Sequence, residues 1–354
     1  MVRLGAMGDI LHALPAVTAL RQAHRSWTID WVVEPVWQPL LTAANGTSAE
    51  PLSLAQPLVN RIFPAPAKTW ARRPLSPSTF SEVGALRSAL RAAGYHAVLD
   101  FQGAVRSALI ARAANSPRVI GEAVPREAPA RWFFSERVAT QGRHVIEQDI
   151  ELAAAVAGDQ LSFISPLLPR ETEAEAWCDR LTASFRGRPV VLLKPGAGWG
   201  AKRWPIERYS AAASALNGRG FQVLVNAGPG EEPLADAIAT QSHGAAVPVQ
   251  CSLAQLIALT RRIALAIGGD TGPLHLACAL GRPVVGIYGP TDPARNGPFG
   301  TRFRVLRSPH SLRNHARRNE PESGLLTITP EDVLAAVDEL LEKGGTQPQE
   351  AAAR

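Results

Sequence analysis

The chain of 354 residues has few cysteines and no long apolar run. Its three cysteines, Cys178, Cys251 and Cys278, lie far apart, with no CxxC pair and no histidine cluster at zinc-binding spacing. A disulfide scaffold is therefore not expected, and a reducing cytoplasm fits. No window approaches the ~20 consecutive apolar residues of a membrane span, and the amino terminus lacks the pattern of a signal peptide. We expect a soluble, cytoplasmic protein.

Acidic residues are outnumbered by basic ones, 31 to 37, which gives a formal net charge of +6 at pH 7. This surplus favours anionic partners such as nucleic acids, phosphorylated lipids or nucleotides. The sequence lacks an aromatic RNA-binding signature and a zinc-finger spacing, so a nucleic acid is not the expected partner.

Apolar β-rich runs alternate with stretches of helical periodicity, which predicts an α/β fold with parallel sheets. The expected strands are residues 27–33, 96–101, 190–193, 222–225, 263–267 and 283–288. The expected helices are residues 10–23, 82–93, 105–114, 206–217, 253–260, 273–280 and 330–343.

The length predicts two domains, because 354 residues exceed the usual size of one. Pro166 and Pro169 interrupt the pattern ahead of an acidic helical stretch at 171–184, so we place the domains at 1–165 and 166–343. The small-residue tail 344–354 is expected to be disordered. The basic, proline-rich segment 64–77 is expected to be a mobile loop without regular helix.

The segment from Ile267 to His275 is the most informative stretch, because the strand expected at 263–267 runs through glycines into a helix start. Backbone N–H groups at a helix start attract anions, and Pro273 suits the first helical turn. Asp270 and His275 add polar groups beside this turn. The alternative is an ordinary turn with Asp270 as the helix cap.

Three further loops follow expected or short strands. Gly5, Gly8 and Asp9 precede a helix, where Asp9 is either a cap or a general base. The glycine-rich loop 194–205 has neither a Walker nor a dinucleotide pattern, and its Lys202 either reaches a diphosphate or is a solvated surface lysine. The carboxylates at the end of loop 226–232 either accept hydrogen bonds from a ribose or begin the next helix. Together the four loops predict a shared cleft.

These motifs resemble the bacterial lipopolysaccharide heptosyltransferases of glycosyltransferase family 9, most closely the heptosyltransferase I group. The resemblance spans Arg3 to about Leu341. It is carried by Leu4-Gly-Ala-Met-Gly-Asp-Ile-Leu-His-Ala-Leu-Pro15, Lys194-Pro-Gly-Ala-Gly198, Lys202-Arg-Trp-Pro205, Gly269-Asp-Thr-Gly-Pro-Leu-His275, Gly289-Pro-Thr-Asp-Pro293 and Gly324-Leu-Leu-Thr-Ile-Thr-Pro330.

The resemblance implies the GT-B fold, in which two Rossmann-like domains with parallel sheets face a central cleft. The acceptor would bind the amino-terminal half and the nucleotide sugar the carboxyl-terminal half. It further implies an inverting transfer of heptose from ADP-heptose to the Kdo of lipid A at the inner membrane surface, without a cofactor or a metal. The absence of a compact Asp-x-Asp motif agrees with metal independence.

Site roles follow from the same resemblance. Asp9 would be the general base, and Lys202 would neutralise the leaving diphosphate. The implied donor-binding residues are Lys194, Gly196, Gly198, Glu231, Glu232, Asp270, Thr271, Gly272 and His275. The expected acceptor-binding residues are Lys68, Arg72, Arg73, Gln102, Arg106, Arg126, Arg143 and His144, most of them basic groups suited to Kdo carboxylates and phosphates.

One departure from the family concerns the start of the chain. Met1-Val2-Arg3-Leu4 is too short for the central strand that precedes this loop in family members, and we expect a start placed too late. If the short form is real, the loop that holds Asp9 would be poorly fixed. Two alternatives therefore stay open: a nucleotide- or glycan-binding protein without catalysis and, less favoured because the glycine fingerprint is missing, a nicotinamide dehydrogenase.

Overall fold

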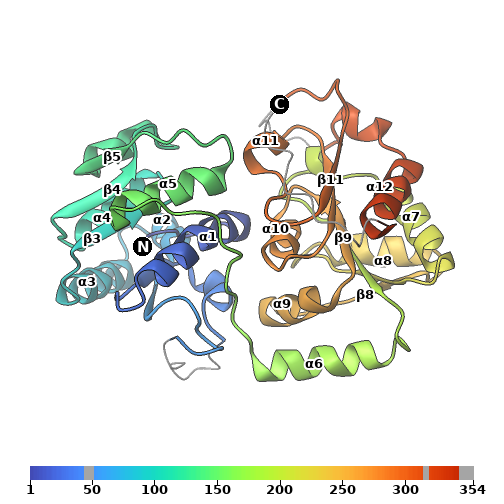
Figure 1. The fold of residues 1–354 in the computed structure, drawn as a ribbon, viewed down its shortest axis with the longest axis horizontal. Helices are drawn as coiled ribbons and strands as arrows, with labels where there is room; N and C mark the ends of the chain where they lie inside the picture. Colours follow the sequence, from blue (N-terminus) through green and yellow to red (C-terminus); the bar gives the residue numbers. More distant parts are fainter. Residues whose placement is uncertain (44–51, 314–318, 343–354) are drawn as a thin grey trace. The chain divides into compact units, whose positions relative to one another are not determined.

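The computed structural model describes residues 1–43, 52–313 and 319–342. The chain divides into two compact units, Met1–Glu171 and Thr172–Arg354, so the division falls a few residues beyond the boundary expected after residue 165. Each unit has parallel strands with helices packed around them (Figure 1). The α/β class with parallel sheets is thereby confirmed.

The first unit contains two small parallel sheets. One pairs β1 (Asp30–Val33) with β2 (Arg61–Pro64), and the other has the order β3 (Ala97–Asp100), β4 (Arg118–Glu122), β5 (Glu136–Val138). Val2 forms isolated parallel bridges to Val32 and Asp100, and so connects the two sheets. The helices are α1 (Met7–Ala23), α2 (Ala67–Arg72), α3 (Pro77–Ala92), α4 (Val105–Ala113) and α5 (Val145–Ala157), with 3-10 turns η1 (Pro35–Leu40) and η2 (Ala128–Phe133).

The second unit is built on a parallel sheet of six strands in the order β11-β10-β9-β6-β7-β8. These strands are β6 (Val190–Lys194), β7 (Gln222–Val225), β8 (Ala246–Pro248), β9 (Leu265–Gly269), β10 (Val284–Tyr288) and β11 (Phe303–Arg307). The helices are α6 (Thr172–Ala183), α7 (Ile206–Gly218), α8 (Glu232–Gln241), α9 (Leu253–Arg262), α10 (Gly272–Ala279), α11 (Pro293–Asn296) and α12 (Pro330–Glu342), with η3 (Gly200–Lys202) and η4 (Ser323–Thr327).

The central strands of this sheet are apolar along their whole length because helices cover both faces. All residues of β6, β7, β9 and β10 are buried, whereas the edge strands β8 and β11 are partly exposed. Side chains of α7 and α12 pack with β6, β7 and β10 in one apolar cluster. The carboxyl ends of β6, β7 and β9 therefore lie next to one another, where the polar loops follow.

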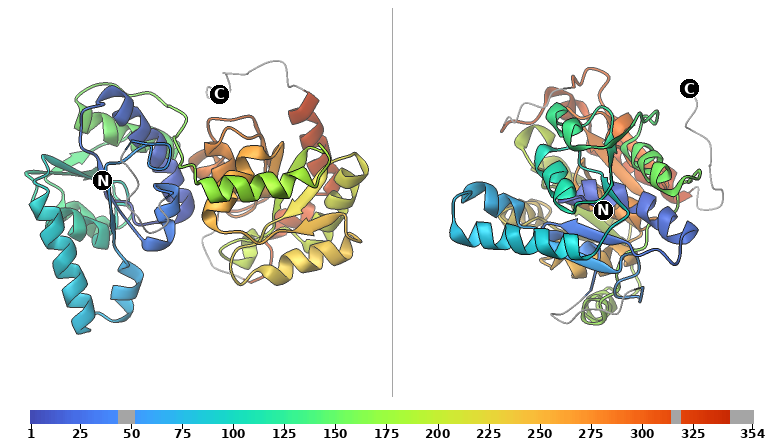
Figure 2. Two further views of the ribbon diagram at one scale, coloured as in Figure 1. Left: turned by 90° about the horizontal axis from the view of Figure 1, so that it is seen from below. Right: turned by 90° about the vertical axis from the view of Figure 1, so that its left-hand side faces the viewer.

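The expected loop at 64–77 is wrong in part, because residues 67–72 form α2 and α3 begins at Pro77. The prolines delimit these helices and do not interrupt them: Pro66 precedes α2, Pro74 follows it, and Pro77 occupies the first turn of α3, where its missing N–H costs no helical hydrogen bond. Figure 2 shows α2 and α3 as a hairpin on the first unit.

Within the described ranges, no helix is long and apolar enough to cross a membrane. The expected disordered tail, 344–354, lies outside the described residues, as does part of the basic run 302–318.

Candidate active site

The turn between β9 and α10 starts a helix where the sequence predicted one. Thr271 occupies the cap position but does not cap, since its Oγ1 donates to the carbonyl of Gly269 at 3.3 Å. Pro273 lies in the first turn. The N–H groups at the start of α10 therefore receive no hydrogen bond from the threonine, which suits them to an anionic group.

Asp270 joins two cationic or polar side chains beside this helix start. Its Oδ2 lies 2.5 Å from Nζ of Lys202, and its Oδ1 lies 3.1 Å from Nε2 of His275. Burial alone would raise the pKa of Asp270, but the hydrogen bond and charge of His275 and the charge of Lys202 hold it well below its usual range. Asp270 thus stays ionised at neutral pH and fixes both partners.

Lys202 is not the solvated surface lysine of the alternative reading. Its side chain is 12% exposed, and its Nζ lies 4.4 Å from the centre of the Trp199 ring. Together, Asp270 and Trp199 hold this ammonium group at the end of η3. The loop that the sequence marked only by its glycines therefore delivers one oriented positive charge.

Lys194, at the carboxyl end of β6, is buried, with 4% of its surface exposed. Its Nζ donates to Oδ1 of Asn226, which follows β7 and whose own Nδ2 donates to the carbonyl of Val249. Burial lowers the pKa of Lys194 to about 8. The sequence placed this lysine in the donor loop, and the structure places its amine inside the unit beside that loop.

Glu231 and Glu232 both begin α8, as one reading of their loop expected. Only Glu231 reaches the glycine-rich loop: its Oε1 pairs with Arg203 at 3.3 Å. A Cβ atom at Gly196 would lie 1.8 Å from its Oε2, so the glycine is what leaves room for this carboxylate. Glu232 instead accepts a hydrogen bond from the Gly230 N–H at 3.1 Å.

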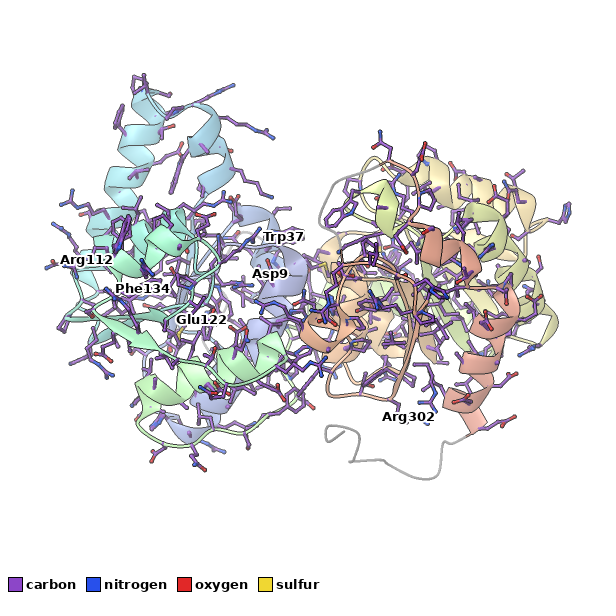
Figure 3. All side chains as sticks on the ribbon, turned by 90° about the horizontal axis from the view of Figure 1, so that it is seen from above. Asp9, Trp37, Arg112, Glu122, Phe134 and Arg302 are labelled. Carbon is purple, nitrogen blue, oxygen red and sulfur yellow. The ribbon has the colours of Figure 1, made fainter. Side chains whose placement is uncertain are left out.

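In the first unit, Asp9 lies in the first turn of α1 and is held on both carboxylate oxygens. Its Oδ1 lies 3.2 Å from Arg3, and its Oδ2 accepts the N–H of Ala6 at 3.0 Å. The side chain of Asp9 is still 37% exposed (Figure 3). It combines the capping role with an accessible carboxylate, and its loop is fixed by these contacts.

Sequence reasoning missed three residues around this loop. Arg3 is buried, pairs with Asp9 and also donates to the carbonyl of Phe101. Trp37 covers Gly5, where a Cβ atom would lie 2.7 Å from the indole nitrogen, and this buried nitrogen has no partner among the described residues. Asp100 ends β3, and burial raises its pKa to about 6. No local pattern marks these residues, because each reaches the loop from a distant segment.

The predicted acceptor residues separate into two groups. Two are buried and bound to nearby backbone: Gln102 accepts the Leu4 N–H at 2.8 Å, and His144 caps α5 by accepting the Ile146 N–H at 3.1 Å. The other six are exposed: Lys68, Arg72, Arg73, Arg106, Arg126 and Arg143. Only these six present a free basic side chain to an approaching anion.

A cavity of about 670 Å³ in the first unit lies elsewhere. It is lined by residues at the amino-terminal ends of β1 and β3, including Asp30, which accepts hydrogen bonds from Arg61 at 2.8 Å and from Tyr95 at 2.7 Å. Asp9 follows the opposite, carboxyl ends, where Leu4 accepts the Glu34 N–H at 3.1 Å. None of the predicted site residues, all of them described, lines this cavity.

In the part of the chain that the structure describes, no group of three or more histidine, cysteine, aspartate or glutamate side chains could hold a metal ion.

Comparison with known sequences identifies the family. Residues 83–325 match glycosyltransferase family 9 (heptosyltransferase). Lipopolysaccharide heptosyltransferase 1 of Escherichia coli (strain K12) is 30% identical over 322 residues, which cover 87% of this chain and 93% of that protein. The chain belongs to glycosyltransferase family 9.

Solved structures agree with this assignment to family 9. The structure described as E. coli heptosyltransferase WaaC with ADP is 27% identical, with a TM-score of 0.76, and the match covers 96% of this chain and 98% of that chain. A family 9 glycosyl transferase from Veillonella parvula DSM 2008, 19% identical with a TM-score of 0.78, shares the fold. The present family 9 chain is therefore a glycosyltransferase, and the non-catalytic and dehydrogenase readings are not needed.

Proposed function

We propose that this glycosyltransferase moves heptose from ADP-heptose to the Kdo of the lipopolysaccharide inner core, with inversion at the anomeric carbon. The names of its relatives support the substrate class: lipopolysaccharide heptosyltransferase 1 from E. coli, and solved E. coli WaaC with ADP or with an ADP-2-deoxy-2-fluoro heptose. The choice of the heptosyltransferase I reaction rests on the 30% identity over 87% of the chain. Heptosyltransferase 2 and 3 relatives match at 27% and 24%.

The observation that carries the proposal is the cluster of Lys202, Asp270 and His275 at the start of α10. When the glycosidic bond to ADP breaks, negative charge develops on the diphosphate. A fixed ammonium group and uncapped helix N–H groups stabilise such charge more in the transition state than in the bound donor, because they need no reorganisation. Lys202 and the N–H groups of Thr271 and Gly272 take this role.

Asp9 acts as the general base. The acceptor hydroxyl oxygen attacks the anomeric carbon, its proton passes to the Asp9 carboxylate, and ADP leaves from the opposite face of the sugar. Arg3 and the Ala6 N–H fix the orientation of the carboxylate while leaving it accessible. This is the arrangement that a base needs if it is to meet an incoming hydroxyl.

The remaining donor residues surround the same strand ends. Glu231 accepts hydrogen bonds from the ribose hydroxyls, while Gly196 and Gly198 let the nucleotide approach the backbone closely. Buried Lys194 contributes to donor binding through Asn226 and through its charge. Glu232 is the weaker ribose candidate, because its carboxylate already accepts the Gly230 N–H.

On the acceptor side, the exposed basic residues bind Kdo carboxylates and lipid A phosphates. Gln102 and His144 shape that surface through the backbone groups they hold. The acceptor is an anionic glycolipid, which is consistent with the net charge of +6. The donor and acceptor assignments place one substrate on each unit.

The test is a panel of nucleotide sugars, including ADP-heptose, incubated with the purified chain and Kdo-lipid A, with products identified by mass spectrometry. We expect one added heptose and an equal amount of ADP, from ADP-heptose alone. Replacing Kdo-lipid A by an acceptor that already carries the first heptose should give no product. Transfer only to that second acceptor would assign the heptosyltransferase II reaction, and donor binding without any product would contradict catalysis.

A further inference from the structure

The hairpin of α2 and α3 carries large apolar side chains on its outside. Leu75 is 83% exposed, Phe80 is 62% exposed and Val83 is 41% exposed. All three lie at or near the turn that joins the two helices, which we call the hairpin tip (residues 72–83). An apolar cluster in solvent on one protruding turn is unusual unless it meets a partner.

The surroundings of the hairpin tip are basic. Between residues 65 and 95 the sequence has five basic residues, Lys68, Arg72, Arg73, Arg87 and Arg91, and a single acidic one, Glu82. The carboxylate of Glu82 accepts a hydrogen bond from Trp70 Nε1 at 2.7 Å, which ties α3 to α2. The outward charge of this hairpin is therefore strongly positive.

The two helical faces of α3 differ in a regular way. Phe80, Val83 and Arg87 share one exposed face through their spacing of three and four residues, while Leu86 and Leu90 pack against the core of the first unit. An exposed helical face with an aromatic residue near one end and arginine further along is typical of segments that lie in a membrane interface.

The hairpin tip is also preformed. The Oγ1 of Thr79 donates to the carbonyl of Arg73 at 2.8 Å, and the Ser76 N–H donates to the same carbonyl at 3.2 Å. Figure 2 shows the tip at the end of the hairpin, away from the strands of its own unit. Little conformational entropy is lost when such a turn inserts its side chains into another phase.

We propose that the hairpin tip docks the enzyme on anionic phospholipid, with Leu75 and Phe80 entering the interface and the neighbouring arginines contacting lipid phosphates. The partner is the bilayer surface itself and not the glycolipid acceptor. Apolar insertion and charge attraction act together here, since either alone gives only weak, reversible binding. This deepens the proposed function, whose acceptor is a lipid, but it is tested without donor or acceptor.

The experiment is flotation of the full chain with vesicles of phosphatidylglycerol and phosphatidylcholine, and with vesicles of phosphatidylcholine alone. We expect binding to the anionic vesicles only, weakened by salt. The double variant Leu75→Ser/Phe80→Ser should lower the partition coefficient about tenfold or more, and Arg87→Glu should weaken it as well. The matched control is Leu312→Ser/Leu326→Ser in the second unit, where the leucines are 77% and 47% exposed; it should bind as the wild type does.

Four outcomes would overturn the docking proposal: no binding of the wild type to anionic vesicles, equal loss in the control variant, unchanged binding of Leu75→Ser/Phe80→Ser, or a concentration-dependent dimer that this double variant abolishes. Transfer to a deacylated, water-soluble acceptor should be unchanged in Leu75→Ser/Phe80→Ser, and its loss would place the tip in the acceptor site instead. A wild type that binds vesicles but transfers no sugar would contradict the proposed function alone.

Discussion

Nζ of Lys202 lies 2.5 Å from Oδ2 of Asp270, although 68 residues separate the two in the chain. The pair joins the glycine-rich loop after β6 to the turn after β9, two strands that are hydrogen-bonded neighbours in the sheet. The opposite oxygen of Asp270 holds His275. The charge proposed to receive the leaving diphosphate is thus set by a carboxylate that is itself fixed on both sides.

Replacing Lys202 tests this charge. Lys202→Met should lower kcat about 10²- to 10³-fold, because one preorganised electrostatic contact to the leaving group is lost. The double variant Lys202→Met/Asp270→Asn should recover part of this loss, since it removes the carboxylate that Lys202→Met leaves unpaired near the diphosphate. Steady-state kinetics of ADP release measures both variants. Arg180→Ala, an exposed arginine of α6, serves as the control, and a double variant slower than the single one contradicts the argument.

Asp9→Asn should separate chemistry from donor binding. The amide cannot accept the hydroxyl proton, so kcat should fall at least about 10³-fold, within the range for loss of a general base. The affinity for ADP, measured by calorimetry, should stay within twofold, because the proposed donor residues all belong to the other unit. Asp159→Asn, at an exposed position of the first unit, should leave both quantities unchanged. A kcat within tenfold of the wild type would remove Asp9 from this role.

Gly196→Ala should act through Glu231. The added Cβ would meet Oε2 of Glu231 at 1.8 Å, so this flexible carboxylate has to leave its place beside Arg203. We expect KM for the donor to rise about tenfold while the free energy of unfolding changes by less than about 1 kcal/mol, the usual range for a surface substitution. Gly218→Ala, where an added Cβ meets nothing within 4 Å, should change neither quantity. An unchanged donor KM in Gly196→Ala would separate Glu231 from the ribose.

Lys194 makes a prediction about pH. Burial lowers its pKa from 10.5 to about 8, so between these values the folded protein binds fewer protons than the unfolded chain. Stability should therefore rise with pH across this window, by about 3 kcal/mol in total, since one pKa unit is worth about 1.4 kcal/mol. The charged amine costs the folded state this amount below pH 8.

Urea unfolding of the wild type and of Lys194→Met from pH 7 to 10.5 measures this effect as a difference, which cancels the other titrating groups. The gap between the two proteins should narrow or reverse in favour of the wild type as the pH rises. Lys68→Met, at an exposed lysine, should run parallel to the wild type. Parallel curves for Lys194→Met would show that its amine is not buried.

The strands and helices with long regular patterns follow from the sequence. Strand β7 and helix α12 begin where their apolar patterns begin, and α12 has its predicted cap, since the Asp332 N–H binds Thr329 Oγ1 at 3.2 Å. Short strands with charged residues escaped prediction, as in β4 and β11, because partial exposure removes the apolar signal. The hairpin of α2 and α3 escaped because prolines can bound a helix as well as break one.

At the site, local motifs marked the loops that hold Asp9, Lys202 and Asp270, since glycine and proline spacing reports the strand-to-helix turns that make them. Which reading of each loop holds was beyond the sequence. Lys202 could have been a surface lysine, and Glu231 could have been no more than a helix start. The choice depends on what lies across the neighbouring strand, which no local spacing encodes.

The sequence by itself determined the α/β class, the family and the loops in which the chemistry lies, because backbone periodicity and turn residues act locally. Only the tertiary structure decided that Asp270 fixes Lys202, that Arg3 holds Asp9 and that Glu231 requires Gly196. Each of these contacts joins residues that are distant in the chain or turned toward one another by the fold. Parallel strands bring such loops together at one sheet edge, and burial there then sets which charges must pair.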